Sequence, residues 1–125
     1  MEPVRPYLRE HYRLPLSITY PVMYSDHATI GEGKVRNLSV FGCMIECTGV
    51  VPDQTTLLVR LLLPDQNESL AIEEAEVRWV KGNRVGLQFR TLQRTADLRL
   101  HMFVWDRMLD RLQGLKQEGS LLPYS

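Results

Sequence analysis

The sequence has only two cysteines, Cys43 and Cys47, in 125 residues. In an extended strand, residues four apart point the same way but lie roughly 13 Å apart, which is too far for a disulfide. We therefore expect two reduced thiols that belong to the core, as in a cytoplasmic protein. The same spacing would suit half of a zinc site, but no second pair of cysteines or histidines follows, so we expect no metal.

Long apolar runs are also lacking. The longest, around residues 61–63, is broken by Arg60 and Pro64. It is much shorter than the roughly 18 residues that a membrane-spanning helix needs. The first residues carry charges and show no apolar stretch of a secretory signal. These absences predict a cytoplasmic protein without a membrane span.

Neither sign of charge is in excess, because 15 Lys and Arg balance 15 Asp and Glu, for a formal net charge of +0. Binding to a nucleic acid polymer depends on many cationic contacts with phosphates, so we expect none, although a small anion site stays possible. The nucleotide and nucleophile motifs GxGxxG, GxxxxGK and GxSxG are absent, and the three histidines have no ligand-like spacing. The chain is therefore expected to bind a ligand and not to be an enzyme.

What the sequence does contain is a series of short segments rich in β-branched and aromatic residues. They cover residues 14–24, 30–38, 42–48, 55–63, 70–81 and 84–90. Turn residues separate them, as is typical of antiparallel strands. In the fifth segment we expect Ala71, Ala75, Val77 and Trp79 to point inward. The pattern predicts a mainly β domain over residues 14–92, a six-stranded antiparallel β-barrel.

The hydrophobic period changes after residue 92. Five apolar residues then recur at spacings of four and three: Leu98, Met102, Trp105, Leu109 and Leu112. Such spacing predicts one stripe on a C-terminal α-helix over residues 93–114, with Thr95 as its N-cap and Gly114 at its end. A loose tail, residues 115–125, is expected to follow. The stripe either covers a face of the barrel or pairs with another copy of the helix in a homodimer.

Two arginines stand in the segment before the first strand. Pro3 and Pro6 disfavour a helix there, so residues 1–13 are expected to form a flexible arm. Arg9 and Arg13 form an RxxxR motif in this arm. A guanidinium group binds a phosphate or the edge of a guanine through paired hydrogen bonds. By itself, however, RxxxR is a weak signal, and a solvated basic tail explains it equally well.

A second motif, NxSxxG, follows the second predicted strand and consists of Asn37, Ser39 and Gly42. Side chains two apart leave a strand on the same face, so the amide and the hydroxyl could contact one guanine base. Gly42 permits either a positive φ or a close approach of two backbones. Asn and Ser in turns also often bond to their own backbone, and that alternative stays open.

The two motifs together, in this order, resemble the signature of the PilZ domain, the bacterial receptor module for cyclic di-GMP. Pro15 follows the RxxxR motif closely, and residues 75–80 and 85–89 are similar to the closing strands of that family. The resemblance implies a six-stranded antiparallel barrel that binds cyclic di-GMP as a ligand, with no cofactor. It also implies that the signal passes to a protein effector by conformational change or partner binding.

The resemblance further implies the roles of individual residues. Arg9 and Arg13 would hold phosphates and guanine edges, Asn37 and Ser39 would hold a guanine, and Gly42 would shape the turn. Some members that have lost these motifs work without ligand, so the alternative function is a PilZ-like protein interaction module in pilus or flagellar assembly.

Three positions qualify this assignment. Leu8 stands where many members have a third arginine, which favours one bound dinucleotide over an intercalated pair. Asn37 replaces a common aspartate, and its single acceptor oxygen implies weaker guanine binding. Trp79 aligns with a common hydrophobic position of the family, for which we expect a core role, with ligand contact as the alternative.

Overall fold

The computed structural model describes residues 14–49, 52 and 55–118 of the chain. The predicted arm, residues 1–13, lies outside this part. The described elements are β1 (Leu14–Ser25), β2 (Ile30–Leu38), β3 (Gly42–Cys47), β4 (Thr56–Leu61), β5 (Leu70–Lys81), β6 (Arg84–Thr91) and the helix α2 (Arg94–Glu118).

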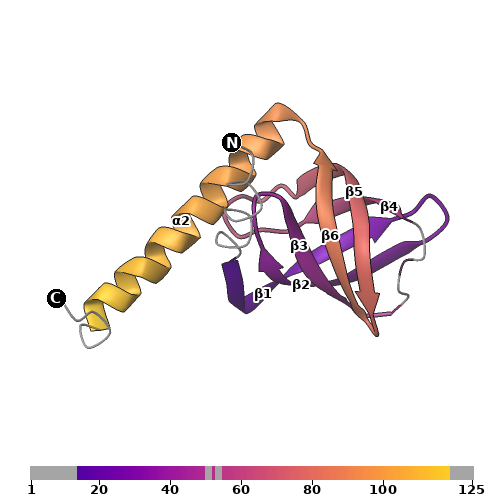
Figure 1. Ribbon diagram of the computed structural model, residues 1–125. Coiled ribbons are helices and arrows are strands. Elements are labelled where there is room, and N and C mark those ends of the chain that lie inside the picture. The colour runs from indigo at the N-terminus through magenta and orange to yellow at the C-terminus, as the bar shows by residue number, and fades with distance from the viewer. Residues whose placement is uncertain (1–13, 50–51, 53–54, 119–125) are drawn as a thin grey trace, which may run out of the picture.

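The six strands form a closed barrel in the order β1-β2-β3-β6-β5-β4, and every neighbouring pair is antiparallel (Figure 1). Only β3–β6 and β1–β4 join strands that are not consecutive in sequence, and β1–β4 closes the barrel. The mainly β barrel with a C-terminal helix confirms the predicted fold.

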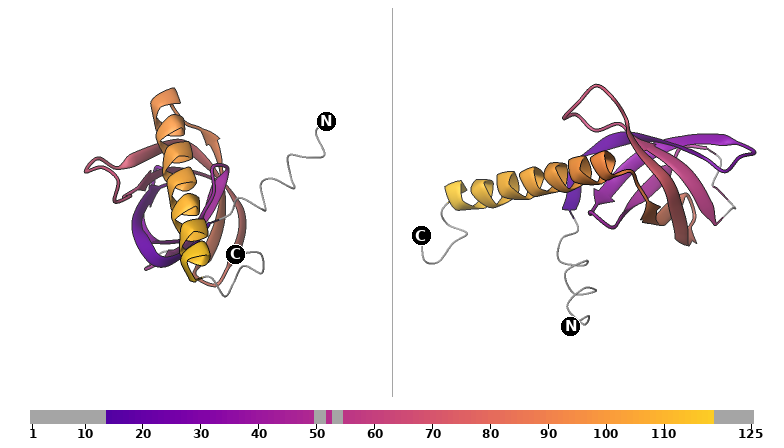
Figure 2. Two further views of the ribbon diagram at one scale, coloured as in Figure 1. Left: turned by 90° about the vertical axis from the view of Figure 1, so that its left-hand side faces the viewer. Right: turned by 90° about the horizontal axis from the view of Figure 1, so that it is seen from above.

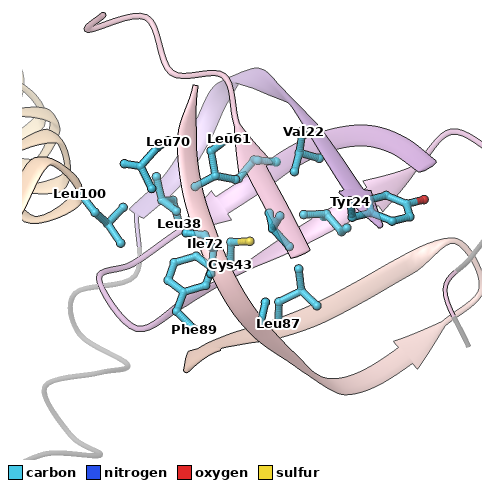
Figure 3. Close-up of a cluster of buried hydrophobic side chains, with 14 of the residues drawn as sticks. Val22, Tyr24, Leu38, Cys43, Leu61, Leu70, Ile72, Leu87, Phe89 and Leu100 are labelled. Atoms are coloured by element: carbon cyan, nitrogen blue, oxygen red, sulfur yellow. The ribbon is translucent and has the colours of Figure 1, made fainter. Parts of the chain in front are cut away.

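The core consists of the inward side chains of the strands, which alternate with exposed ones as a half-buried sheet requires. In β4, for example, Leu57, Val59 and Leu61 are buried while Leu58 and Arg60 are exposed. Figure 3 shows Leu100 of α2 entering this core from the helix side, near Leu38 and Leu70 of the strands.

The two cysteines belong to this core, as the sequence predicted. Cys43 and Cys47 are both buried thiols on β3, opposite Leu38 and Gly33 of β2. Burial raises the pKa of the Cys47 thiol, so the group stays protonated at neutral pH.

The inner face of β5 differs from the prediction because the strand carries a bulge. In the pairing with β4, Val59 lies opposite Ile72 and Leu57 lies opposite Ala75, so β5 has one extra residue between Ile72 and Ala75. Leu70 and Ile72 are buried before this bulge, and Ala75 is buried after it. A bulge adds one residue to one strand and so reverses the alternation of faces. Ala71, which was expected to point inward, therefore lies between two buried residues and faces outward.

A second register shift in β5 changes the position of Trp79. Val77 pairs with Leu87 and Trp79 pairs with Gly86, so Arg78 is the extra residue. This shift turns the indole outward, and its exposed fraction is 43%. The expectation that Trp79 belongs to the core is therefore wrong. The ring lies against Gly86, where an added Cβ would meet Trp79 Nε1 at 2.1 Å.

The helix α2 covers the barrel with a different face from the predicted stripe. Leu100, Phe103 and Val104 are buried against the barrel, and Phe103 meets Tyr20 of β1 edge-on, with ring centroids 5.7 Å apart. The predicted stripe is solvent-exposed instead: Leu98 63%, Met102 54%, Trp105 61%, Leu109 38% and Leu112 55%. The stripe therefore does not cover the barrel.

The helix also runs past its expected end. Gly114 has no positive φ, and α2 continues to Glu118. A glycine inside a helix costs only about 1 kcal/mol relative to alanine, and good helix formers surround it. The expected tail therefore begins no earlier than residue 119. Figures 1 and 2 show the C-terminal half of α2 standing clear of the barrel.

A charged pair fixes the N-terminal half of α2 to the barrel. Arg99 of the helix donates from Nε and Nη2 to the two carboxylate oxygens of Asp65 in the β4–β5 loop, at 3.0 and 2.8 Å. These bonds lower the pKa of the Asp65 carboxyl group. Within the described residues, no helix is both long enough and apolar enough to cross a membrane.

Candidate functional site

The turn between β2 and β3 is built around the side chain of Ser39. Its hydroxyl accepts the N–H groups of Phe41 and Gly42, both at 3.1 Å, and donates to the carbonyl oxygen of Gly42 at 3.2 Å. The Ser39 N–H donates to the same oxygen at 2.8 Å. A hydroxyl has one donor and two acceptor positions, so Ser39 is fully used within the turn. Ser39 is buried inside the turn, with an exposed fraction of 1%.

Gly42 brings β3 close to β6. A Cβ added at this position would lie 2.2 Å from the carbonyl oxygen of Leu87. Such contacts do not occur in real structures, so any other residue would push the strands apart. Of the two expected roles for Gly42, the structure shows the close backbone approach, because its φ is not positive.

Asn37 follows a bulge in β2. It pairs with Met44 of β3 after a register shift between Val35 and Asn37, and it is half-buried. Arg36 is the extra residue, and its Nη1 lies 3.2 Å from Glu46 Oε1 at the surface. The bulge thus sets the point from which the Asn37 side chain leaves the strand.

The predicted arm joins the barrel beside this motif. Leu14 pairs with Leu38, and Pro15 pairs with Asn37. Arg13 is therefore covalently bonded to a residue that lies opposite the end of β2. Leu8, Arg9 and Arg13 themselves lie outside the described residues, so their predicted roles are not tested.

A hollow of about 220 Å³ opens on the outside of the barrel next to the turn. Ser39 and Gly42 line one side, and Arg78, Trp79 and Gln88 line the other. An indole face stacks on a nucleobase, a guanidinium group attracts phosphate, and an amide can donate and accept. The hollow therefore has the chemistry of a nucleotide site.

Two residues of this hollow were missed by the sequence analysis. Arg78 reaches it because it is the extra residue of the β5 bulge, which strand alternation does not reveal. Gln88 reaches it because β6 pairs with β3 and lies opposite Gly42. Arg78 Nη1 lies 3.5 Å from Glu76 Oε2 at the surface, and exposed pairs of this kind are weak. The guanidinium of Arg78 can therefore turn to a ligand at little cost.

A second hollow, of about 520 Å³, lies between the turn and α2. Val40 and Phe41 form one wall, and Trp105, Met108 and Leu109 are among the residues of the other. Its lining is almost wholly apolar, which does not suit a nucleotide. Phe41 lines both this hollow and the one on the barrel.

A third hollow, of about 530 Å³, lies along α2 and contains none of the motif residues. Its Arg99 is already bonded to Asp65. No group of three or more His, Cys, Asp or Glu side chains in the described part of the chain is placed to hold a metal ion.

The sequence was compared with protein-family profiles and with curated protein sequences. The PilZ domain family profile matches residues 7–104. No curated protein sequence matches the chain significantly.

Several solved structures are similar in fold. The Bacillus subtilis inhibitor of motility MotI superposes with a TM-score of 0.62 at 18% identity over 78% of this chain, which spans only 50% of that protein. The PilZ domain of CeSA from a cellulose-synthesizing bacterium gives a TM-score of 0.57 at 19% identity, covering 77% of this chain and 97% of that domain. The uncharacterized Legionella protein Lpg0364 gives a TM-score of 0.52 at 16% identity, covering 81% of this chain and 97% of that protein.

Proposed function

Since the chain belongs to the PilZ domain family, we propose that it is a receptor for cyclic di-GMP that passes the signal to a protein effector. The observation that carries this proposal is the position of Trp79. The β5 bulge turns its indole out of the core and into the same hollow as the Ser39–Gly42 turn. A large aromatic ring half-exposed beside a ligand motif suits base stacking.

Each side chain of the site has a distinct role in this proposal. Trp79 stacks on a guanine, and the Asn37 amide bonds to the Watson–Crick edge of a base. Ser39 does not contact the ligand through its hydroxyl, because the turn already uses that group fully. Instead, Ser39 holds the turn in the shape that the ligand meets.

The arginines of the arm complete the site. Arg9 and Arg13 hold the phosphates and guanine edges from the side where Leu14 and Pro15 pair with the end of β2. Arg78 adds a cation from the barrel itself. Ordering the arm over the ligand costs conformational entropy, which the charge-assisted contacts must exceed.

Isothermal titration of the full chain with cyclic di-GMP, with GTP as the control ligand, tests this function. We expect saturable binding, with Arg9→Ala or Arg13→Ala each costing roughly 1.5–3 kcal/mol, the range for hydrogen bonds to charged groups. Trp79→Ala costs about 1–3 kcal/mol through lost stacking, whereas Trp79→Phe retains most of the affinity. Arg84→Ala, at the exposed β5–β6 turn, is the matched control and leaves the affinity unchanged.

The titration also gives the stoichiometry. One dinucleotide per chain agrees with Leu8 in place of a third arginine, and two would contradict that reading. If Arg9→Ala and Arg13→Ala both bind cyclic di-GMP within a factor of two of wild type, the proposed site is wrong.

A second candidate function is a PilZ-like interaction module that works without ligand, in pilus or flagellar assembly. The saturated Ser39 hydroxyl favours it, since the motif then has a purely structural use. One structural neighbour is named as an inhibitor of motility, which suits a regulator of a protein machine under either candidate. No heat and no thermal shift at saturating ligand would select this second function.

A further inference from the structure

The helix α2 carries two apolar faces, and its own barrel covers only one of them. Leu100, Phe103 and Val104 are buried against the barrel. At 3.6 residues per turn, the stripe from Leu98 to Leu112 lies on the opposite side of the helix. All five of its side chains are large and exposed. The stripe borders the β2–β3 turn on one side and the β4–β5 loop on the other, but neither covers it, so it is a continuous and largely exposed apolar surface.

The C-terminal half of α2 gains little stability from the barrel, so an exposed apolar stripe on it is unfavourable. Among the helix side chains described, up to Gly114, Met108 is the last that packs against the core, and the C-terminal half of α2 extends away from the barrel (Figure 2). A helical extension of about ten residues is marginal in water on its own. Leu109 and Leu112 lie on this extension and are exposed. Burial of the stripe would hold the extension helical.

The spacing of the stripe identifies what covers it. Leu98, Met102, Trp105, Leu109 and Leu112 follow the 4-3-4-3 repeat in which a and d positions alternate along the seam of a coiled coil. We infer that a second copy of this chain covers the stripe, with the two α2 helices paired antiparallel. The stripe shares no residue with the hollow on the barrel that is proposed to bind the nucleotide.

The charges beside the stripe select the orientation. Arg99 and Asp106 flank the seam on one side, seven residues apart. In an antiparallel pair, each Arg99 lies near Asp106 of the second copy, so two ion pairs form. A parallel pair would instead place Arg94 against Arg99 across the seam, and like charges there are unfavourable.

Asp106 is exposed, and Arg99, whose side chain is 12% exposed, keeps one nitrogen for this contact. Asp65 takes Nε and Nη2 of Arg99, which leaves Nη1 for another acceptor. Asp106 forms no ion pair among residues 14–49, 52 and 55–118 of its own chain.

The same charges select the register. When Met102 faces Trp105 of the second copy, Leu98 faces Leu109 and each Arg99 lies near an Asp106. A shift by one heptad would bring the two Asp106 carboxylates together at the two-fold axis. The antiparallel pair therefore has one favoured alignment, centred between Met102 and Trp105.

Sedimentation of the full chain over a range of concentrations tests the pairing. Wild type is expected to form a dimer, and Leu109→Glu raises the dissociation constant at least about 100-fold, because each copy loses a buried leucine. Leu58→Glu is the matched control, since Leu58 is an exposed leucine on β4, and it leaves the dimer intact. A monomeric wild type, or an unchanged Leu109→Glu dimer with a native circular dichroism spectrum, would overturn the inference.

Disulfide trapping tests the orientation independently of stability. Under mild oxidation, the double variant Leu98→Cys/Leu109→Cys cross-links between copies, whereas Leu98→Cys alone does not. In the antiparallel register, two residues at position 98 are separated by about 16 Å along the helix axis. The native cysteines are buried and give no background. Cross-linking of Leu98→Cys alone would show a parallel pair and overturn the assignment.

Discussion

At the scale of single residues, the shape of the β2–β3 turn depends on Ser39 and Gly42, because the contacts of each exclude other side chains. Ser39 satisfies two N–H groups and one carbonyl of its turn. Gly42 lets β3 and β6 approach so closely that an added Cβ would meet the backbone of Leu87. Both features shape the floor of the hollow on the barrel before any ligand arrives. Ser39 and Gly42 of the NxSxxG motif thus have a structural role in the turn.

Gly42→Ala should lower the free energy of unfolding by about 1–3 kcal/mol, because the new methyl group forces the two strands apart. Gly49→Ala is the matched control: no atom lies within 4 Å of an added Cβ there, so its effect should be close to zero. Urea denaturation of both variants measures the difference. Equal stabilities for the two variants would contradict the close approach.

At the scale of elements, α2 is held to the barrel by an apolar face and one well-formed ion pair. The Arg99 and Asp65 side chains are only 12% and 28% exposed, and two hydrogen bonds join them. The pair Arg107–Asp110 within the helix is much more exposed, at 42% and 61%. The two pairs therefore differ in how strongly solvent screens them.

Asp65→Asn should lower stability at neutral pH by about 1.5–3 kcal/mol, since it removes charge-assisted hydrogen bonds. The folded-state pKa of Asp65 is lowered by Arg99. Its contribution is therefore fully present above the ordinary carboxyl pKa of about 3.9 and is lost as the pH falls through the lowered value.

Denaturation of wild type and Asp65→Asn across this pH range measures the effect, and the two stabilities should converge at low pH. Asp110→Asn is the control and should change stability by no more than about 0.5 kcal/mol. A wild-type advantage over Asp65→Asn that persists undiminished in acid would show that the charge of Asp65 is not its source.

At the scale of the whole molecule, the chain consists of a closed barrel and a helix that extends beyond it. The barrel has a continuous core that includes Leu100, Phe103 and Val104. Among the described residues, the C-terminal half of α2 contributes no buried side chain to this core, and it extends away from the barrel (Figure 1). Protection of this half from solvent should therefore depend on the second copy.

Hydrogen exchange at several protein concentrations checks this dependence. Amides after Met108 in α2 should exchange faster on dilution, because the dimer that covers them dissociates. Amides of the barrel and of the first half of α2 should not change. Slow, concentration-independent exchange of the C-terminal half, or equal protection in Leu109→Glu, would contradict a role for pairing.

Much of this architecture could be predicted from the sequence. Alternation of apolar and polar residues located all six strands, and the change of period located the helix. The face of Trp79 was not predictable, because two bulges in β5, one against β4 and one against β6, reverse the alternation. The first bulge arises in the pairing with β4 and the second in the pairing with β6, and neither pairing is visible in the residue pattern of β5 itself.

The site was predicted in part. Of the three motif residues, Ser39 and Gly42 line the hollow and Asn37 does not. The inward position of the Ser39 hydroxyl depends on the turn that it builds. Arg78 and Gln88 were missed because only the pairing of β3 with β6, and of β6 with β5, brings them beside that turn. The helix stripe was found, but the residues that pack on the barrel could be told apart only in three dimensions.

The ring of Phe41 belongs to both the hollow on the barrel and the hollow under α2. Under the proposed function, a nucleotide that changes the position of this ring in the first hollow would change the shape of the second. Thermodynamic linkage then works in both directions: whatever factor the nucleotide imposes on binding at the helix, binding at the helix imposes on the nucleotide. If the proposed receptor function holds, the concentration of whatever binds at the helix would set the sensitivity of the chain to the nucleotide.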